Sequence, residues 1–169
     1  MKVIIREAKK TDCREIGRLI QELRAVLRRP DGPKTTVESL ERDGFETNPP
    51  LFGCYVAEEE SENSEDQTED KVLVGYALYY YAYSTWNGKK LFLDDVFVTE
   101  RCQGKSVGAM LFEEIVKHTI ANKCAYMEVH VASCNEFQDY YQYLGLENMT
   151  KTEKWNLFRL EGEALQLVA

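Results

Sequence analysis

The sequence predicts an α/β fold in one domain, because strand and helix periodicities alternate along its 169 residues. One strand and two amphipathic segments come first, three consecutive strand patterns follow, and helices and strands then alternate. Consecutive strands joined by tight turns pair antiparallel, whereas a strand–helix–strand unit gives a parallel pair. We therefore expect a mixed, mostly antiparallel sheet with flanking helices, built from residues 1–169 as a single domain.

The first strand and the first helix are predicted from two different spacings of apolar residues along the chain. Residues 2–8 alternate enough for a strand. Thr11 or Asp12 can cap a helix, and Glu15 is placed to complete a capping box with Asp12. An apolar stripe at helical spacing comes next and comprises Ile16, Leu19, Ile20, Leu23 and Leu27.

A short second helix and a strand complete the first third of the chain. Thr35 or Thr36 can cap this helix, Leu40 would face the core, and Gly44 is placed to end it. Residues 52–57 then read as a strand.

Acidic residues are concentrated between positions 58 and 70. The eight acids there account for the whole net charge of −8 and are Glu58, Glu59, Glu60, Glu62, Glu65, Asp66, Glu69 and Asp70. Such a run without a basic residue is typical of a solvated, mobile loop. We expect residues 58–70 to form one, and a chain whose charge is acidic gives no support for nucleic-acid binding.

The second half contains the remaining elements of the predicted sheet. Asn87-Gly88 favours a hairpin between two strands, and Gly145 is placed to close a short helix. The expected strands span 72–83, 91–98, 126–131 and 155–160, and the expected helices span 107–120 and 136–144.

Residues 91–120 read as a strand, a glycine-containing turn and a helix. Free backbone N–H groups and the positive end of a helix make such a turn a phosphate site. A P-loop needs a glycine where this chain has Thr99, and a dinucleotide fingerprint needs one where it has Ser106. The turn therefore matches neither a P-loop nor a dinucleotide-binding fingerprint, and its phosphate ligand is expected to be of another kind.

The run Q-G-K-S-V-G, residues 103–108, resembles motif A of the GNAT superfamily of N-acetyltransferases, Q/R-x-x-G-x-G/A. Ser106 replaces the first motif glycine, and a positive φ there would cost more for serine than for glycine. Residues 79–98 resemble the diamine acetyltransferase branch, which includes spermidine/spermine and thialysine acetyltransferases. The resemblance extends from Ile5 to Trp155, and it implies a GNAT fold with a splayed parallel strand pair, acetyl-CoA as co-substrate and a homodimer.

The resemblance also implies which residues bind acetyl-CoA. The strand supplies backbone groups to pantetheine, the turn and helix start bind the pyrophosphate, and a family asparagine lies seven residues before a catalytic tyrosine. In this sequence these positions are Val96, Phe97, Val98, Gln103, Gly104, Lys105, Ser106, Val107, Gly108, Ala109 and Asn135. Asn135 lies six residues before Tyr141 rather than seven, so it is either shifted by a deletion or only a helix cap.

Two adjacent acids interrupt the strand at 91–98. A primary ammonium with a pKa of about 10.4 must lose a proton before it can attack a thioester. Asp94 and Asp95 can bind the cation and relay its proton. Neighbouring strand residues point to opposite faces, so both can face a substrate only at a bulge. We expect Asp95 to be the more buried, catalytic acid and Asp94 to contact the amine; the alternative is a pair of strand-end or salt-bridged acids.

The leaving thiolate needs an acid, and the resemblance assigns this role to a tyrosine shortly before a glycine. Counting back four residues from Gly145 gives Tyr141. Tyr140 is the competing assignment, and aromatic packing of the helix is the structural alternative.

Substrate specificity is inferred from departures within the same resemblance. Leu27 stands where polyamine-acetylating relatives place a glutamate, whereas the substrate acid Glu153 is retained. This favours thialysine or a short diamine over spermine. Trp86 and residues 79–81 could line the pocket, although sheet packing explains those tyrosines equally well, and His130 could line the cleft.

The sequence therefore predicts an acetyl-CoA-dependent N-acetyltransferase that acetylates the terminal amine of a small cationic substrate directly in a ternary complex. A polyamine or protein-lysine acetyltransferase, a non-catalytic acyl-CoA-binding module and a nucleotide-binding protein are the alternatives. Five cysteines without C-x-x-C spacing and two histidines without metal spacing predict no metal site. Without a signal peptide or a long apolar run, we expect no membrane contact and a cytoplasmic location.

Overall fold

The computed structural model describes residues 2–29, 31–60, 72–131 and 138–168. These residues form two compact units, 1–130 and 131–169, and each is considered separately.

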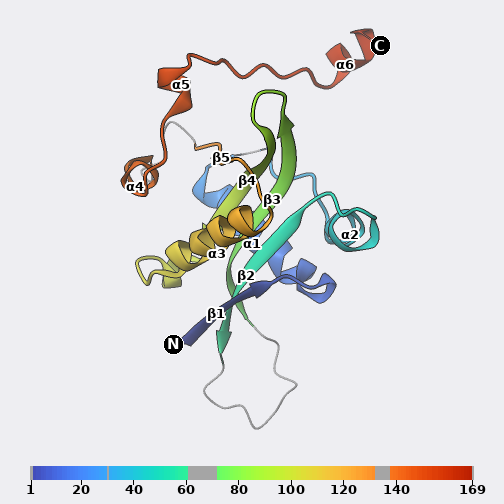
Figure 1. The fold of residues 1–169 in the computed structure, drawn as a ribbon. Helices are drawn as coiled ribbons and strands as arrows, with labels where there is room; N and C mark the ends of the chain where they lie inside the picture. The colour runs from blue at the N-terminus through green and yellow to red at the C-terminus, as the bar shows by residue number, and fades with distance from the viewer. Residues whose placement is uncertain (1, 30, 61–71, 132–137, 169) are drawn as a thin grey trace. The chain divides into compact units, whose positions relative to one another are not determined.

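The first unit contains a five-stranded sheet (Figure 1) in the order β1-β2-β3-β4-β5. Its strands are β1 (Lys2–Glu7), β2 (Gly53–Glu60), β3 (Leu73–Ser84), β4 (Gly88–Val98) and β5 (Met127–Val129). Neighbours from β1 to β4 pair antiparallel, and β4 pairs with β5 in parallel. The mixed, mostly antiparallel α/β sheet predicted from the sequence is confirmed.

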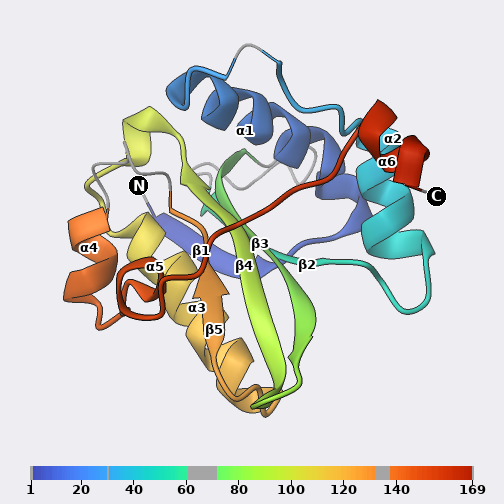
Figure 2. The same cartoon turned by 90° about the horizontal axis from the view of Figure 1, so that it is seen from above.

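Helices α1 (Cys13–Val26) and α3 (Val107–Ala121) cover opposite faces of this sheet (Figure 2). We call these the α1 face and the α3 face. On the α1 face, α1 packs on β3 and β4, and the short helix α2 (Val37–Glu41) packs against α1. The core there comprises Cys13, Ile16, Leu19, Leu40, Cys54, Val56, Leu73, Tyr76 and Phe97.

Of the two helix-start signals near the N-terminus, the capping box predicted for Asp12 is wrong and the cap predicted at Thr36 is confirmed. Asp12 forms no capping box with Glu15, because its carboxylate instead accepts hydrogen bonds from Arg6 at 2.7 Å and from the backbone of Lys9 at 2.7 Å. A 3₁₀ turn, η1 (Lys10–Asp12), therefore precedes α1. Thr36 does cap α2, and its side chain accepts from the Ser39 backbone.

Gly44 does not end the second helix. The chain continues through it as a π-helical turn, η2 (Arg42–Glu46), and becomes extended at Thr47. A Cβ at position 44 would lie 2.5 Å from the Phe52 ring. Gly44 is therefore required by close packing rather than as a helix stop.

The predicted acidic loop begins later than expected, because β2 extends through Glu60. Glu58 lies opposite Ile4 in the β1–β2 register and is only 4% exposed. Its carboxylate accepts a hydrogen bond from Arg6 Nε at 2.6 Å, and this pairing offsets the cost of burying it. The prediction of a loop is wrong for residues 58–60, and residues 61–70 lie outside the described part of the chain.

The hairpin predicted at Asn87-Gly88 is confirmed, with Gly88 at a φ of 88° between β3 and β4. β4 begins at Gly88, earlier than expected, because its pairing with β3 continues down to the turn. β5 is shorter than the predicted 126–131 strand.

The described part of the second unit is helical: α4 (Gln138–Tyr143), α5 (Met149–Thr152) and α6 (Glu163–Val168). Gly145, at a φ of 91°, follows α4 as predicted. The strand predicted at 155–160 is wrong. These residues are extended without a sheet partner and are exposed, and an isolated segment without hydrogen-bonding neighbours is not a strand.

Candidate active site

Strands β4 and β5 pair over only three positions before they separate. The pairs are Leu91–Met127, Phe92–Glu128 and Leu93–Val129. β4 continues to Val98, and within the described residues no strand pairs with that edge of β4 beyond Leu93. The backbone of residues 96–98 therefore has no strand partner on that edge among the described residues, and an extended ligand could hydrogen-bond to it as a strand does.

A β-bulge lies where the two strands separate. Leu78 on β3 pairs with Asp95, and the next residue, Tyr79, pairs with Leu93, so Asp94 is the additional residue. A bulge breaks the alternation of side chains and allows Asp94 and Asp95 to share a face. The condition required for both acids to face a substrate is met.

Two contacts place this acid pair on the α1 face. The hydroxyl of Tyr76, which belongs to the core beneath α1, donates to Asp95 Oδ2 at 3.3 Å. The charge of Asp94 raises the pKa of Tyr80, which follows Tyr76 on the same face of β3, although desolvation is the larger cause. Asp94 is exposed and Asp95 is half-buried.

The environment of Asp95 favours its protonated form. Burial, together with the nearby charge of Asp94, raises its pKa to about 6, although the Tyr76 hydrogen bond acts in the opposite direction. Desolvation also raises the pKa of Asp94, and the charge of His130 opposes this. A carboxyl group with a pKa near 6 can accept and release a proton close to neutral pH.

The turn before α3 contains two residues in the left-handed region of backbone conformation. A 3₁₀ turn, η3 (Glu100–Cys102), leads into residues 103–106, whose side chains are exposed. Gly104 has a φ of 73°, and Ser106, the N-cap residue of α3, has a φ of 64°. The serine thus occupies a left-handed conformation at the position where the motif has glycine. Val107 is buried and anchors the helix.

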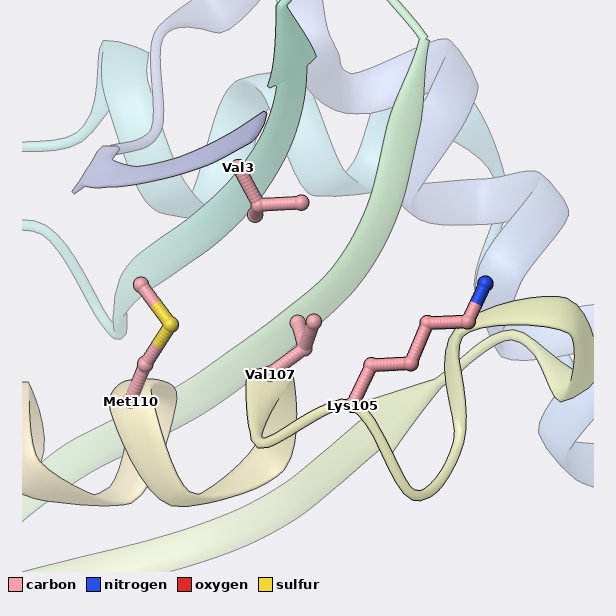
Figure 3. A pocket seen from close by; sticks show the side chains of 4 residues that line it. All are labelled: Val3, Lys105, Val107 and Met110. Carbon is pink, nitrogen blue, oxygen red and sulfur yellow. The ribbon is translucent and has the colours of Figure 1, made fainter. Parts of the chain in front are cut away.

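Side chains of this turn contact β4 and a neighbouring cavity. Gln103 Nε2 donates to the Val98 carbonyl at 3.1 Å, which ties the turn to the end of β4. Lys105 lines a cavity of about 410 Å³ with Val3, Val107 and Met110 (Figure 3). The exposed N–H groups at the start of α3 and the nearby cation can hold a phosphate group.

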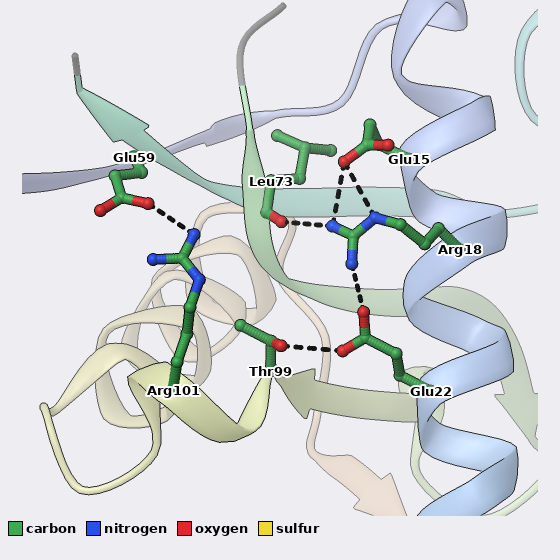
Figure 4. Close-up of polar contacts among 7 residues, drawn as sticks. All are labelled: Glu15, Arg18, Glu22, Glu59, Leu73, Thr99 and Arg101. Atoms are coloured by element: carbon green, nitrogen blue, oxygen red, sulfur yellow. Dashed lines mark hydrogen bonds and ion pairs between the residues drawn. The ribbon is translucent and has the colours of Figure 1, made fainter.

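A polar network that the sequence did not reveal fixes the entry to this turn (Figure 4). Thr99 Oγ1 donates to Glu22 of α1 at 2.8 Å, and Glu22 also pairs with Arg18. Arg101 Nη2 contacts Glu59 of β2 at 2.6 Å. The partners are separated by 77 and 42 residues in the chain, so no local pattern could have identified them.

The expected aromatic lining is divided between the two faces. Tyr79 and Tyr81 lie on the α3 face around His118, whose Nε2 is 2.7 Å from the Tyr81 hydroxyl. Trp86 is 93% exposed in the hairpin turn, away from the acid pair. Of the tyrosine run, only Tyr80 shares the face of Asp94.

On that face, three aromatic rings lie side by side across adjacent strands. Tyr80 stacks on Phe92 with centroids 5.1 Å apart, and Phe92 meets His130 edge-on at 4.7 Å. Desolvation raises the pKa of Asp94, and His130 is close enough to that carboxyl for its charge to oppose the rise. The adjacent ring of Phe92 was not singled out from the sequence.

The other predicted site residues belong to the end of α1 and to the second unit. Leu27 caps the C-terminus of α1 and is 37% exposed. In the second unit, Tyr141 is half-buried on α4 beside Tyr140, and Glu153 accepts a hydrogen bond from Trp155 Nε1 at 2.6 Å. Asn135 lies outside the described residues.

Comparison with known proteins identifies the family. Residues 16–146 match the model of the Acetyltransferase (GNAT) family, and this match crosses the boundary between the two units. The chain belongs to the GNAT family. It is thus an acyltransferase, and the matched residues include the turn at 103–108.

Two curated relatives and one solved structure illustrate this GNAT chain's similarities. Thialysine N-epsilon-acetyltransferase of Bos taurus is 37% identical over 99% of this chain and 97% of its own length. Spermidine/spermine N(1)-acetyltransferase-like protein 1 of Homo sapiens is 38% identical over 95% of this chain but 23% of its own length. The structure of AAC(6')-Iy with the bisubstrate analog CoA-S-monomethyl-acetylneamine has a TM-score of 0.71 and 18% identity, and the match covers 96% of this chain and all of that one.

GNAT acetyltransferases use acetyl-CoA as the acyl donor, and the turn at 103–106 with the open edge of β4 fits its pyrophosphate and extended pantetheine. Among the described residues, no group of three or more His, Cys, Asp or Glu side chains could hold a metal ion. None of the helices in the described ranges is long and apolar enough to cross a membrane.

Proposed function

We propose that this GNAT enzyme acetylates the terminal primary amine of a small cationic substrate such as thialysine, a related lysine analogue or a short diamine. The observation that carries the proposal is the bulge in β4, which presents Asp94 and Asp95 on one face where β4 and β5 separate. Relatives named as thialysine acetyltransferases, 35–37% identical over nearly the whole chain, support this substrate class.

In this proposal, acetyl-CoA binds along the end of β4 and the start of α3. Its pyrophosphate lies at residues 103–106, where backbone N–H groups and the helix N-terminus offer positive potential. Its pantetheine pairs with the exposed edge of residues 96–98. A backbone N–H of that edge polarises the thioester carbonyl and stabilises the oxyanion that forms on attack.

The acid pair would prepare the amine. Asp94 binds the ammonium group, and Asp95, ionised above a pH of about 6, accepts its proton directly or through water. The neutral amine then attacks the thioester carbon, and the tetrahedral intermediate collapses with cleavage of the C–S bond. The CoA thiolate takes a proton from the Tyr141 hydroxyl. The nitrogen of the intermediate releases its remaining excess proton, which restores the Tyr141 phenolate through water, and the products are the acetylated amine and CoA.

The polyamine acetyltransferase remains the alternative, favoured by the 38% identity to a relative named for spermidine and spermine. Leu27 argues against a long polyamine because a leucine provides no counter-charge for an additional ammonium group. The homodimer remains a prediction from the resemblance, and the cytoplasmic location and the single-domain organisation remain predictions from the sequence.

The proposal is tested by incubating the protein with acetyl-CoA and thialysine and locating the acetyl group by NMR. We expect acetylation at the terminal amine, and a large loss of rate in Asp95→Asn. Intersecting lines in a two-substrate initial-velocity plot would support direct transfer. Parallel lines, together with an isolable acetylated protein, would contradict the ternary complex.

A further inference from the structure

An ion pair with no assigned role lies on the same sheet face as the acid pair. Lys90 Nζ on β4 contacts Glu128 Oε2 on β5 at 2.6 Å, and the two side chains are 20% and 35% exposed. The pair is cross-strand and partly open to solvent, so its two charges are accessible to a small ligand.

Strand geometry aligns this pair with Asp94. Lys90 and Phe92 are two residues apart on β4 and therefore point to the same face. Glu128 lies opposite Phe92 in the parallel register, and His130 follows it by two residues. The α1 face consequently carries, in order along β4, an acid at Asp94, an aromatic surface at Phe92, and a paired anion and cation.

This order is complementary to an α-amino acid with an amine at the end of its side chain. Resting on the proposed function, we propose that Glu128 binds the α-ammonium group and Lys90 the α-carboxylate of such an amino acid, while Asp94 holds the side-chain amine for acetylation. The rings of Tyr80, Phe92 and His130 then contact the chain between the two ends.

The dimensions agree with a substrate of lysine length. Asp94 lies four residue steps from Lys90 along the strand, and these steps span about 13 Å at about 3.3 Å per residue. An extended lysine spans roughly 8 Å from its terminal nitrogen to its carboxylate at about 1.3 Å per bond. The remaining distance of about 5 Å is within reach of the flexible four-carbon stem of Lys90 together with the Asp94 side chain.

The same geometry disfavours a polyamine. A polyamine has no carboxylate to bind Lys90, so only one of the two charges of the pair would find a partner on it. The pair would thus select an amino acid because both charged groups of its zwitterionic head are bound.

Three substrates of equal chain length distinguish the role of Lys90 from that of Glu128. Lysine has both α-groups, cadaverine lacks the carboxylate, and 6-aminohexanoate lacks the α-amine. Lys90→Gln should lower kcat/KM about tenfold for lysine and 6-aminohexanoate and leave cadaverine within about twofold. Glu128→Gln should lower kcat/KM for lysine, because Glu128 binds the α-ammonium group, and for cadaverine, because Glu128 binds its second ammonium group in the same way. The same substitution should leave kcat/KM for 6-aminohexanoate unchanged, because this substrate has no such group.

Lys89→Gln is the matched control, because Lys89 is the adjacent lysine but lies on the other face, with Nζ 3.9 Å from the Tyr81 ring centroid. It should change none of the three substrate ratios. Equal losses on all three substrates in Lys90→Gln would show that the pair only stabilises the sheet and would overturn the assignment. A wild-type enzyme that acetylates cadaverine but neither carboxylate substrate would overturn this assignment alone. Failure to acetylate any amine would overturn the proposed function and the assignment with it.

Discussion

The buried hydroxyl of Tyr76 donates a hydrogen bond to Asp95 Oδ2 over 3.3 Å, from β3 to the bulged part of β4. Tyr76 is fully buried and its own pKa is raised, mainly by desolvation, so it stays protonated and can only donate. It therefore stabilises the carboxylate form of an acid whose pKa burial and Asp94 raise to about 6. The tyrosine thus partly controls the pH at which Asp95 can accept a proton.

Tyr76→Phe should move the acidic limb of the kcat/KM profile to higher pH by about half a unit to one unit. The sign follows because the lost hydrogen bond favoured the ionised form, so its removal raises the pKa of Asp95. The measurement is kcat/KM for the amine between pH 5 and 8. Tyr79→Phe, at a buried tyrosine on the α3 face, is the control, and superimposable profiles for wild type and Tyr76→Phe would refute the role of Asp95.

Tyr141→Phe should lower kcat by about a hundredfold, the usual contribution of a general acid, with little change in the KM for acetyl-CoA. The phenylalanine preserves the ring and removes only the proton donor. Tyr140→Phe, whose ring lies 5.9 Å from that of Tyr141, is the matched control and should retain turnover. The reverse pattern would transfer the acid role to Tyr140.

Ser106→Gly should stabilise the protein by up to about 1 kcal/mol, because Ser106 occupies the left-handed region at a φ of 64°, where a Cβ is unfavourable. This corresponds to a rise in Tm of about 2–4 °C for a chain of this size. Ala109→Gly is the control. Ala109 lies three residues after Ser106, inside helix α3, where glycine is unfavourable, so this substitution should instead lower the Tm. A lower Tm in Ser106→Gly would mean that the serine side chain makes a compensating interaction.

Arg6→Gln should destabilise the first unit by about 3 kcal/mol, because Arg6 is the cation between the carboxylates of Asp12 and the nearly buried Glu58. Urea unfolding measures the loss. Lys2, on the same strand as Arg6, forms an exposed pair with Glu60 of β2 at 2.7 Å, and Lys2→Gln should cost less than about 1 kcal/mol. Equal effects of the two substitutions would contradict a structural role for the buried pair.

Local patterns predicted much of the fold correctly because their causes are local. Strand β1, helix α1 and the turn at Asn87-Gly88 each depend on neighbouring residues, and the structure confirms these elements. Strand alternation likewise required a bulge if Asp94 and Asp95 were to share a face, and the β3–β4 register contains one.

The errors arise where a distant partner decides the outcome. Glu58 reads as part of an acidic loop until Arg6, 52 residues away, is seen beside it. Gly44 reads as a helix stop, although its size is dictated by Phe52. Residues 155–160 have strand composition but no strand to pair with in the described part of their unit. The separation of Tyr80 from Tyr79 and Tyr81 follows from strand alternation, yet only the sheet shows which face carries the acids.

The most direct test of the central claim is the release of free thiol from acetyl-CoA by the wild-type protein with thialysine, lysine, putrescine, spermidine and spermine. We predict rapid release with thialysine or lysine, slower release with putrescine and little with spermine. A preference for spermidine or spermine would show that other acids compensate for Leu27 and would contradict the assigned substrate class. No thiol release with any of the five amines would contradict a small-amine acetyltransferase altogether.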